Sequence, residues 1–379
     1  MRAYDAVKSR LTVSPTATRI LGLFLAVRLA TLLVAWLIGA ARPELGITEI
    51  LTDWDGNWNE FVANDLYRKV AVGGIFTDEW MMLAFLPVLP VTTHVLHVVT
   101  GVGVHILGPL VSMSAGALGF FVLGRYLSRR FGERVALVAA GFMLVSPNAF
   151  VLSMFYTEGP TILFVALTFD ALERRRWARA GVWALIGGIT RPNGFLLLVP
   201  CLIAAVLEIR RHGWPRARSS LLAPLLAPIG FVLWLVMVWK VTGEPGGYFR
   251  LQETGWGARF DAGEETLRAF GRLVLGRDAG IDERMNVIAS TIIGVGGVLL
   301  ALRRKLDPVL TGYAIAVVVL ALTSARQASG ARFLLPAFPL FVAWAMAIPR
   351  RHQLWVGALL ATTMGSLFVL SITGLVYTP

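Results

Sequence analysis

Acidic and indole side chains lie side by side in the segment that follows the first long hydrophobic run. Asp53 and Asp55 flank Trp54, and Gly56 and Trp58 follow closely. A carboxylate beside aromatic rings at a membrane surface can accept a proton from a hydroxyl group or hold a sugar. Glycine loosens the backbone next to it, which would let Asp55 enter a cleft. The alternative is an interfacial belt, in which tryptophans anchor at headgroup depth and the acids face water.

Three arginines occur at breaks between hydrophobic runs, and each is a candidate for binding a phosphate. Arg191 precedes a proline in Thr-Arg-Pro-Asn, and Arg326 and Arg332 flank a short Gln-Ala-Ser-Gly-Ala turn. Arginine offers paired N–H donors and keeps its charge, which suits a phosphate. The alternatives are a snorkelling arginine at a helix end for Arg191, and headgroup-binding arginines for the other two.

Tyr156 and Glu158 belong to another short segment between two runs, where Glu158 would be held at the membrane boundary. The alternative for Glu158 is an acid that the dipole favours at a helix N-terminus. Arg28 lies inside the first run. Charges within a membrane usually face the interior of the bundle and pair there, so we favour a structural role for Arg28 over a catalytic one.

Two patterns are compatible with a metal, and neither is favoured. His94, His97 and His105 would share a face of a continuous helix, but two glycines interrupt it and no acid lies nearby. The Asp53-x-Asp55 pair is similar to the metal-binding acids of nucleotide-sugar transferases. That pattern is short, and an outer face has no pool of nucleotide sugars. The sequence therefore predicts no metal and no other cofactor.

The runs that must position these residues indicate a polytopic helical membrane protein. Of the 379 residues, 56% are hydrophobic and 15% charged, whereas soluble domains are about a quarter charged. Several runs reach the roughly 20 residues that a spanning helix needs. The only cysteine, Cys201, excludes an internal disulfide. We attribute the net charge of +12 to cytoplasmic loops and contact with membrane lipids, not to nucleic acid.

Basic clusters decide the predicted topology, because Lys and Arg concentrate in cytoplasmic loops. The clusters lie at 1–19, 125–134, 173–179, 208–218, 303–305 and 350–351. All of them reach the cytoplasm only if 82–101 is re-entrant or interfacial, 104–124 spans, and 177–208 forms two short helices that meet outside at 190–193. The result is a single domain, 1–379, an all-α bundle of about 11 transmembrane helices with a cytoplasmic N-terminus.

Two outer loops carry most of the acids. The first outer loop with its re-entrant segment is 41–103, and the second is 242–285, where we expect one short helix near 264–275. Residues 41–82 and 242–285 each hold eight Asp or Glu, out of 23 in the chain. The polar chemistry is therefore expected on the extracytoplasmic face of the cell membrane.

Six motifs in a fixed order resemble the GT-C class of membrane glycosyltransferases. The closest resemblance is to the family of the GPI mannosyltransferase that adds the second mannose, with its bacterial relatives. The sequence departs from the family pattern at three places. Asn59 follows Trp58, Leu66-Tyr67 replaces the usual Gly-Tyr, and Arg332-Phe333 replaces the usual Arg-Tyr. The motifs are Trp54-Asp55-Gly56, Phe61-x-Ala63, Ala84-Phe-Leu-Pro-x-x-Pro90, Phe155-Tyr-Thr-Glu158, Thr190-Arg-Pro-x-Gly194 and Arg332-Phe-Leu-Leu-Pro-Ala-Phe-Pro339.

The resemblance implies an inverting transferase that takes its sugar from a polyprenyl or dolichyl monophosphate, with Asp55 as the essential acid and Asp53 nearby. We expect mannose, with arabinose and glucose left open, and a lipid or cell-envelope glycan as acceptor. The alternatives are a transporter or flippase of a lipid-linked sugar, or an inactive scaffold subunit. The expected donor phosphate-binding residues are Arg191, Arg326 and Arg332, and the expected substrate-binding residues are Trp54, Trp58, Tyr156, Glu158 and Asn193.

Overall fold

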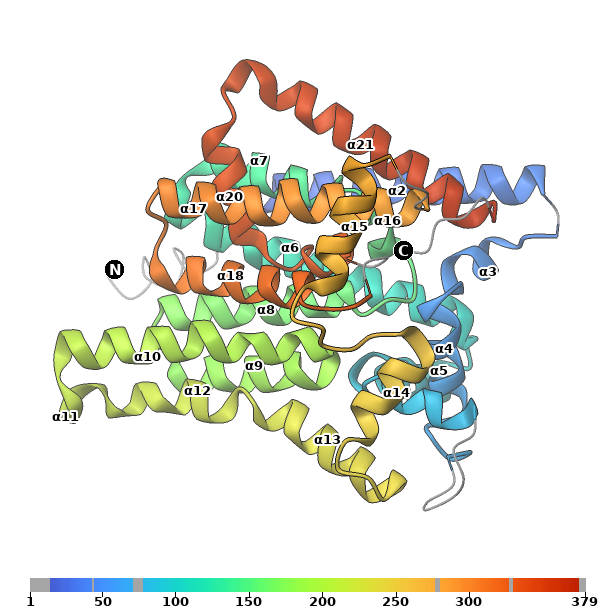
Figure 1. Cartoon of the computed structure of the whole chain (residues 1–379), viewed down its shortest axis with the longest axis horizontal. Helices are drawn as coiled ribbons and strands as arrows, with labels where there is room; N and C mark the ends of the chain where they lie inside the picture. The colour runs from blue at the N-terminus through green and yellow to red at the C-terminus, as the bar shows by residue number, and fades with distance from the viewer. Residues whose placement is uncertain (1–13, 43, 71–77, 277–279, 327–329, 375–379) are drawn as a thin grey trace, which may run out of the picture.

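The computed structural model describes residues 14–42, 44–70, 78–276, 280–326 and 330–374. Within these ranges the protein is all-α, and the only strand-like pairing is an isolated bridge between Phe260 and Ser324. Many of the longer helices run side by side (Figure 1). The short helix α11 lies at one end of the bundle, and α3, α4, α5 and α14 gather at the opposite end.

The first half of the chain forms the elements that carry the acidic side of the site. They are α2 (Pro15–Ala41), α3 (Ile47–Thr52), α4 (Asp55–Asp65), the 3₁₀ helix η1 (Asp78–Ala84), α5 (Val88–Thr100), α6 (Val104–Phe131), α7 (Glu133–Leu144), the 3₁₀ helix η2 (Ala149–Ser153) and α8 (Glu158–Glu173).

The second half begins with the predicted pair of short helices. Its elements are α9 (Trp177–Thr190), the 3₁₀ helix η3 (Pro192–Leu197), α10 (Leu198–His212), α11 (Trp214–Ala217), the 3₁₀ helix η4 (Arg218–Leu221), α12 (Leu222–Leu226), α13 (Ile229–Thr242), α14 (Gly247–Trp256), α15 (Glu264–Val274), α16 (Ile281–Ala289), the π-helix η5 (Ser290–Gly296), α17 (Gly297–Arg303), α18 (Pro308–Leu322), α19 (Gly330–Phe333), α20 (Phe338–Ala347) and α21 (Arg350–Ile372).

Within the described residues, six helical stretches are long and apolar enough to cross a membrane, which confirms a multi-pass membrane protein. Three further apolar helices are shorter. The predicted number of eleven spans stays a prediction. The six stretches are Pro15–Ala41, Val104–Phe131, Pro192–His212, Trp214–Thr242, Glu283–Arg303 and Arg350–Ile372.

Several predicted boundaries are matched and one prediction is wrong. The break at 190–193 falls between α9 and η3, and 82–101 becomes η1 followed by a 13-residue helix, α5. At 1.5 Å per residue such a helix is roughly 20 Å long, too short to cross alone. The second outer loop holds α14 as well as α15, not one helix. Its glycine-rich sequence concealed α14.

A small aromatic cluster holds that additional helix in place. Trp80 of η1, Trp234 of α13, and Tyr248 and Leu251 of α14 are all buried together. The indole N–H of Trp234 donates to the carbonyl of Leu83 at 3.1 Å. This packing fixes α14 against η1 and α13, and so brings the two outer loops together over the end of the bundle.

Candidate active site

The acidic segment is built around a strained residue at the start of α4. Trp54 has φ 57° and ψ −119°, a conformation that L-residues rarely adopt. The kink at Trp54 lets the helix begin at Asp55, whose carboxylate lies in the first turn, where the helix dipole favours it. The backbone freedom expected of Gly56 is not used, because Gly56 lies inside the helix. The unusual backbone is at Trp54 instead.

Asn59 ties this turn to the segment that precedes Glu158. Its side-chain amide donates to the carbonyls of Asp55 at 3.0 Å and Phe155 at 3.1 Å. The backbone N–H of Phe155 in turn donates to the carbonyl of Leu51 at 2.8 Å. The asparagine that departs from the family motif therefore has a structural role, since it is buried and joins two of the motifs.

Glu158 is placed by close packing of α6 on α8. A Cβ on Gly159 would lie 2.2 Å from the carbonyl oxygen of Ser112, so only glycine permits this approach. Glu158 begins α8 and is 1% exposed. The helix N-terminal interpretation is therefore correct but incomplete, because Glu158 also pairs with two arginines.

Arg191 extends from the break between α9 and η3. A Cβ on Gly194 would lie 1.9 Å from the carbonyl oxygen of Gly187, so the turn is packed directly against α9. Arg191 is buried, forms an ion pair with Glu158, and lies over the ring of Phe333 at 5.4 Å. This supports a buried cation with a specific partner and not a snorkelling side chain.

Arg332 completes an alternating chain of charges. Its Nη1 lies 2.7 Å from Asp55 Oδ2, and its Nε lies 3.2 Å from Glu158 Oε1. The order Asp55, Arg332, Glu158, Arg191 alternates acid and base, and we call these four residues the charge chain. Its members come from α4, α19, α8 and the α9–η3 break. Burial lowers the pKa of Arg332, but the nearby Asp55 and Glu158 outweigh it and raise the pKa overall, so this arginine stays charged.

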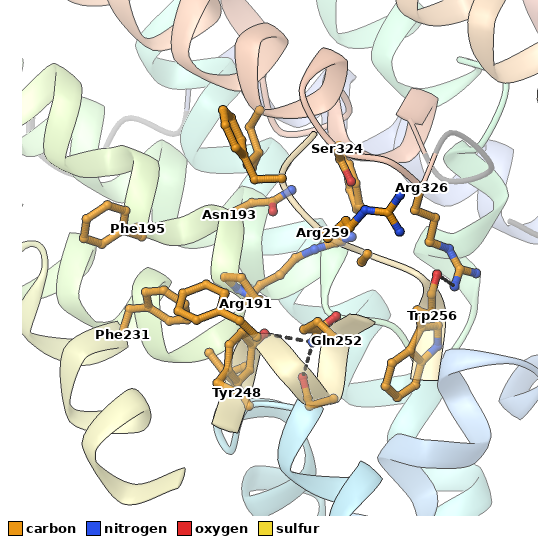
Figure 2. Close-up of a pocket in the computed structure, with 18 of the residues that line it drawn as sticks. Arg191, Asn193, Phe195, Phe231, Tyr248, Gln252, Trp256, Arg259, Ser324 and Arg326 are labelled. Atoms are coloured by element: carbon orange, nitrogen blue, oxygen red, sulfur yellow. Dashed lines mark hydrogen bonds between the residues drawn. The ribbon is translucent and has the colours of Figure 1, made fainter. Parts of the chain in front are cut away.

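The charge chain opens on a cavity of about 630 Å³. Asp55, Arg191, Asn193, Arg326 and Arg332, all predicted site residues, line it. Figure 2 shows several of its side chains, including Arg191, Asn193 and Arg326, together with aromatic residues of the second outer loop. Arg326 donates to the carbonyl of Trp256 at 3.1 Å. Residues 327–329 of its turn lie outside the described residues.

The other predicted site residues are not among the described residues that line this cavity. Glu158 supports the two arginines, and the Tyr156 hydroxyl accepts from the backbone N–H of Asp55 at 3.3 Å. Trp58 stacks on Phe85, which does line the cavity. Trp54 is 39% exposed beside Asp55.

Asp53 differs from Asp55 in its environment. Its Oδ1 accepts from the backbone N–H of Trp54 at 2.7 Å and from the side chain of Asn57 at 3.4 Å. Burial raises its pKa, and the hydrogen bond from Trp54 offsets this only in part. Asp53 therefore stabilises the turn before α4, whereas Asp55 is presented to the cavity.

Sequence reasoning missed the part of the cavity that α13, α14 and the following segment supply. Gln252 donates to the Tyr248 hydroxyl at 2.9 Å and to the carbonyl of Ala84 at 3.3 Å, which links both outer loops (Figure 2). The sequence feature that could have identified this part of the cavity is the occurrence of two arginines and several aromatic residues within the acidic loop 242–285. The missed lining residues include Phe231, Tyr248, Phe249, Arg250, Gln252, Glu253, Trp256 and Arg259.

Two remaining expectations concern charged or metal-binding side chains. Arg28 is buried and donates to the carbonyls of Ala149 at 2.6 Å and Leu144 at 2.9 Å. It also donates to the Ser153 hydroxyl at 3.3 Å, so its described hydrogen-bond partners are uncharged groups, consistent with a structural role. His94 contacts the carbonyl of Ala63, and His97 that of Val102. Among the described residues, no three His, Cys, Asp or Glu side chains gather as metal ligands.

Comparisons with known proteins find one family model and several solved structures that are similar to this chain. Residues 87–239 match the family model described as dolichyl-phosphate-mannose-protein mannosyltransferase. No curated protein matches the chain by sequence. The structure of ArnT from Cupriavidus metallidurans bound to undecaprenyl phosphate is similar, with a TM-score of 0.58, 17% identity, and coverage of 96% of this chain and 67% of that one.

Two more solved structures extend the comparison. ArnT in the apo state also gives a TM-score of 0.58 at 17% identity, over 96% of this chain and 66% of that one. The Archaeoglobus fulgidus oligosaccharyltransferase in complex with Zn and sulfate gives 0.50 at 15% identity, over 90% of this chain and 53% of that one. The family match covers residues 87–239 of the 379 residues, and the solved structures show that the chain shares the fold of ArnT.

Proposed function

We propose that the chain transfers a sugar, with mannose as the first candidate, from a polyprenyl-phosphate-linked donor to a hydroxyl group of a lipid or cell-envelope glycan. The reaction takes place on the extracytoplasmic face of the cell membrane and inverts the anomeric centre. The observation that carries the proposal is that one carboxylate, Asp55, and two buried arginines, Arg191 and Arg332, line the same cavity. The fold comparison and the family match favour a transferase over a flippase.

Asp55 is the general base in this scheme. As the acceptor oxygen bonds to the anomeric carbon, its proton passes to Asp55, and the bond between that carbon and the phosphate oxygen breaks. The polyprenyl phosphate leaves with the electron pair. Inversion follows if the acceptor and the phosphate lie on opposite faces of the sugar.

Arg191 and Arg332 stabilise the charge that develops on the leaving phosphate. Fixed cations in a site sheltered from water are effective here because they need no reorganisation during the reaction. Arg332 already lies beside Asp55, yet a guanidinium has five N–H donors. It can therefore contact the base and the phosphate together and fix the distance between them. Arg326 also lines the cavity and is a third candidate for the phosphate.

Asn193 has a polar atom that suits a sugar hydroxyl. Its buried Nδ2 has no hydrogen-bond partner among the described residues. Asn193 lines the cavity, so its amide can donate directly to the substrate. A buried donor without a partner is costly, typically about 1–3 kcal/mol, and a ligand that satisfies it gains that much in affinity.

The remaining walls suit a lipid. Ala84, Phe85 and Leu86 come from the predicted re-entrant segment 82–101, and Phe231, Phe249 and Phe333 add further apolar surface. The solved ArnT structure contains undecaprenyl phosphate, which supports a donor of this type. In our proposal the tail contacts this apolar surface while its phosphate reaches the two arginines.

The test is a transfer assay. Membranes with and without the protein are incubated with radiolabelled polyprenyl-phosphate-mannose, and with the arabinose and glucose equivalents. We expect a new labelled glycolipid or glycoprotein with one donor, and a loss of that product with Asp55→Asn. If label crosses the membrane in proteoliposomes without forming a new glycoside, the flippase alternative is correct and the transferase proposal is wrong.

A further inference from the structure

Helix α15, in the second outer loop, has three distinct faces. Ala269 is buried against the rest of the protein, while the charged residues of the helix lie on a second face. Leu267, Phe270 and Val274 are three and four residues apart and so share a third face. These side chains are 74%, 47% and 67% exposed. The apolar face of α15, defined by these three residues, is therefore not the face that packs on the protein.

The apolar face continues into other exposed hydrophobic side chains. Leu275 directly after the helix is 65% exposed, and Ile281 at the start of α16 is 42% exposed. Helices α15 and α16 are in contact, and α16 leads into a candidate membrane span whose residues Ile292 and Leu299 are 54% and 61% exposed. Exposed hydrophobic side chains therefore occur on α15, at the start of α16 and on the candidate span that follows.

The orientation of α15 is that of a helix lying along a membrane surface. In Figure 1 it runs across α16 and α17 and not alongside them. An amphipathic helix in this orientation can bury its apolar face at the boundary between headgroups and acyl chains.

The charged face of α15 is neutralised internally. Arg272 pairs with Glu265 at 2.5 Å and with Glu283 of α16 at 2.7 Å. Arg268 pairs with Glu264 and Glu265. Two arginines and two glutamates within the helix cancel, so attraction to anionic lipid contributes little to its position. The apolar face must supply the binding energy.

The segment that precedes α15 lines the cavity. This segment pairs with the end of α18, since the N–H of Asp261 donates to the carbonyl of Thr323 at 3.1 Å. The Thr266 hydroxyl donates to the carbonyl of Leu322 at 2.6 Å. Phe260 in that segment lines the cavity and is nevertheless 78% exposed. The cavity therefore reaches the molecular surface next to α15.

We infer that the apolar face of α15 lies in the outer leaflet of the bilayer and forms one side of the passage by which a lipid-linked substrate enters the cavity. The membrane placement rests on exposed side chains and charge alone. The role in substrate entry rests on the proposed function. The two parts are tested separately.

Membrane placement is tested by quenching in neutral phosphatidylcholine nanodiscs. Single cysteines replace Leu267, Phe270 or Arg268 in a Cys201→Ala background and carry a bimane label. We expect acyl-chain nitroxide lipids to quench the labels at 267 and 270, and aqueous iodide to quench the label at 268, the matched control on the charged face. Adding anionic lipid should change neither pattern. Equal iodide quenching at 267 and 268 contradicts the inference, and so does shielding of 267 from both quenchers, which would indicate a protein partner or a second copy.

Substrate entry is tested with the variant Leu267→Asp/Phe270→Asp. We expect its KM for a long-chain polyprenyl donor to rise roughly tenfold, because charge on this face opposes insertion beside the lipid. The KM for a short, water-soluble prenyl donor should not change. An unchanged KM for the long-chain donor contradicts the passage. If the wild-type protein transfers no sugar, the proposed function fails, while the quenching result still decides where α15 lies.

Discussion

Asp53 and Asp55 are two residues apart, yet they lie in different environments. Asp55 lines the cavity and contacts Arg332, whereas Asp53 accepts hydrogen bonds within its own turn. We predict that Asp55→Asn lowers the transfer rate by about 10²–10⁴, the usual effect of losing a positioned base. Asp53→Asn should cost far less, because an amide oxygen still accepts from Trp54. Rates are measured at saturating donor, with and without EDTA.

Thermal stability provides the control for this pair. Burial raises the pKa of Asp53, so the folded state favours its neutral form. The favourable contribution of protonated Asp53 is present at low pH and is lost as pH rises through the folded pKa. The melting temperature of Asp53→Asn relative to wild type should therefore be higher at neutral pH than in acid. If Asp53→Asn lowers the transfer rate more than Asp55→Asn does, the general base is Asp53. If both variants lose most of their transfer activity and EDTA inhibits the reaction, the two acids bind a metal.

Arginine geometry at 191 and 332 gives a second prediction. Alanine at either position should raise the KM for the donor and lower turnover. Lysine should restore part of the activity, because it keeps the charge but cannot bond bidentately. Arg326→Ala, on the cavity wall but outside the charge chain, is the matched comparison and should have a smaller effect. Wild-type kinetics in both Arg191→Ala and Arg332→Ala would remove these residues from phosphate binding.

The conformation of Trp54 gives a third prediction. A non-glycine residue with this backbone stores strain of about 1 kcal/mol or more, which glycine would relieve. Trp54→Gly should therefore be more stable to unfolding than Trp54→Ala by about 1 kcal/mol, although both lose the indole. Equal unfolding free energies in the two variants would show that the backbone at this position is not strained.

At the scale of elements, Arg28 connects α2 to the segment that leads into the site. Its guanidinium satisfies carbonyls at the end of α7 and in η2, just before Phe155 to Glu158. We predict that Arg28→Met lowers the free energy of unfolding by roughly 2–4 kcal/mol, because buried carbonyls lose their partners. The control on the same helix is Arg19→Met, which breaks only an exposed pair with Glu133 and should cost under about 1 kcal/mol. Similar losses in the two variants would contradict this role.

The sequence predicted the elements better than their contacts. The break at 190–193, the short helix near 264–275 and the concentration of acids in the first outer loop could be predicted from local signals such as proline, charge and period. The pairing of Arg332 with Asp55 does not, because it joins residues far apart in sequence. Helix α14 was missed because its stability comes from the aromatic cluster around Trp80 and Tyr248, not from local propensity.

At the scale of the whole molecule, topology is the remaining prediction. The basic clusters place α3, α4 and α14 outside and α11 inside, at opposite ends of the bundle in Figure 1. In a Cys201→Ala background, cysteines at Asn57 and Arg268 should react with an impermeant thiol reagent in intact cells, and one at Ala178 should not. All three residues are exposed in the structure, so a difference reports the side of the membrane. Labelling at 178 from outside would overturn the topology.

The charge chain also has a consequence for how the protein is made. Its members arrive in the order Asp55, Glu158, Arg191, Arg332 as the chain is synthesised from its N-terminus. Until α19 emerges, two acids share one arginine, and an uncompensated carboxylate near the membrane boundary destabilises the partly assembled bundle. Arg332 therefore completes assembly as well as the site. A chain that ends before Arg332 has two acids and one arginine of this cluster.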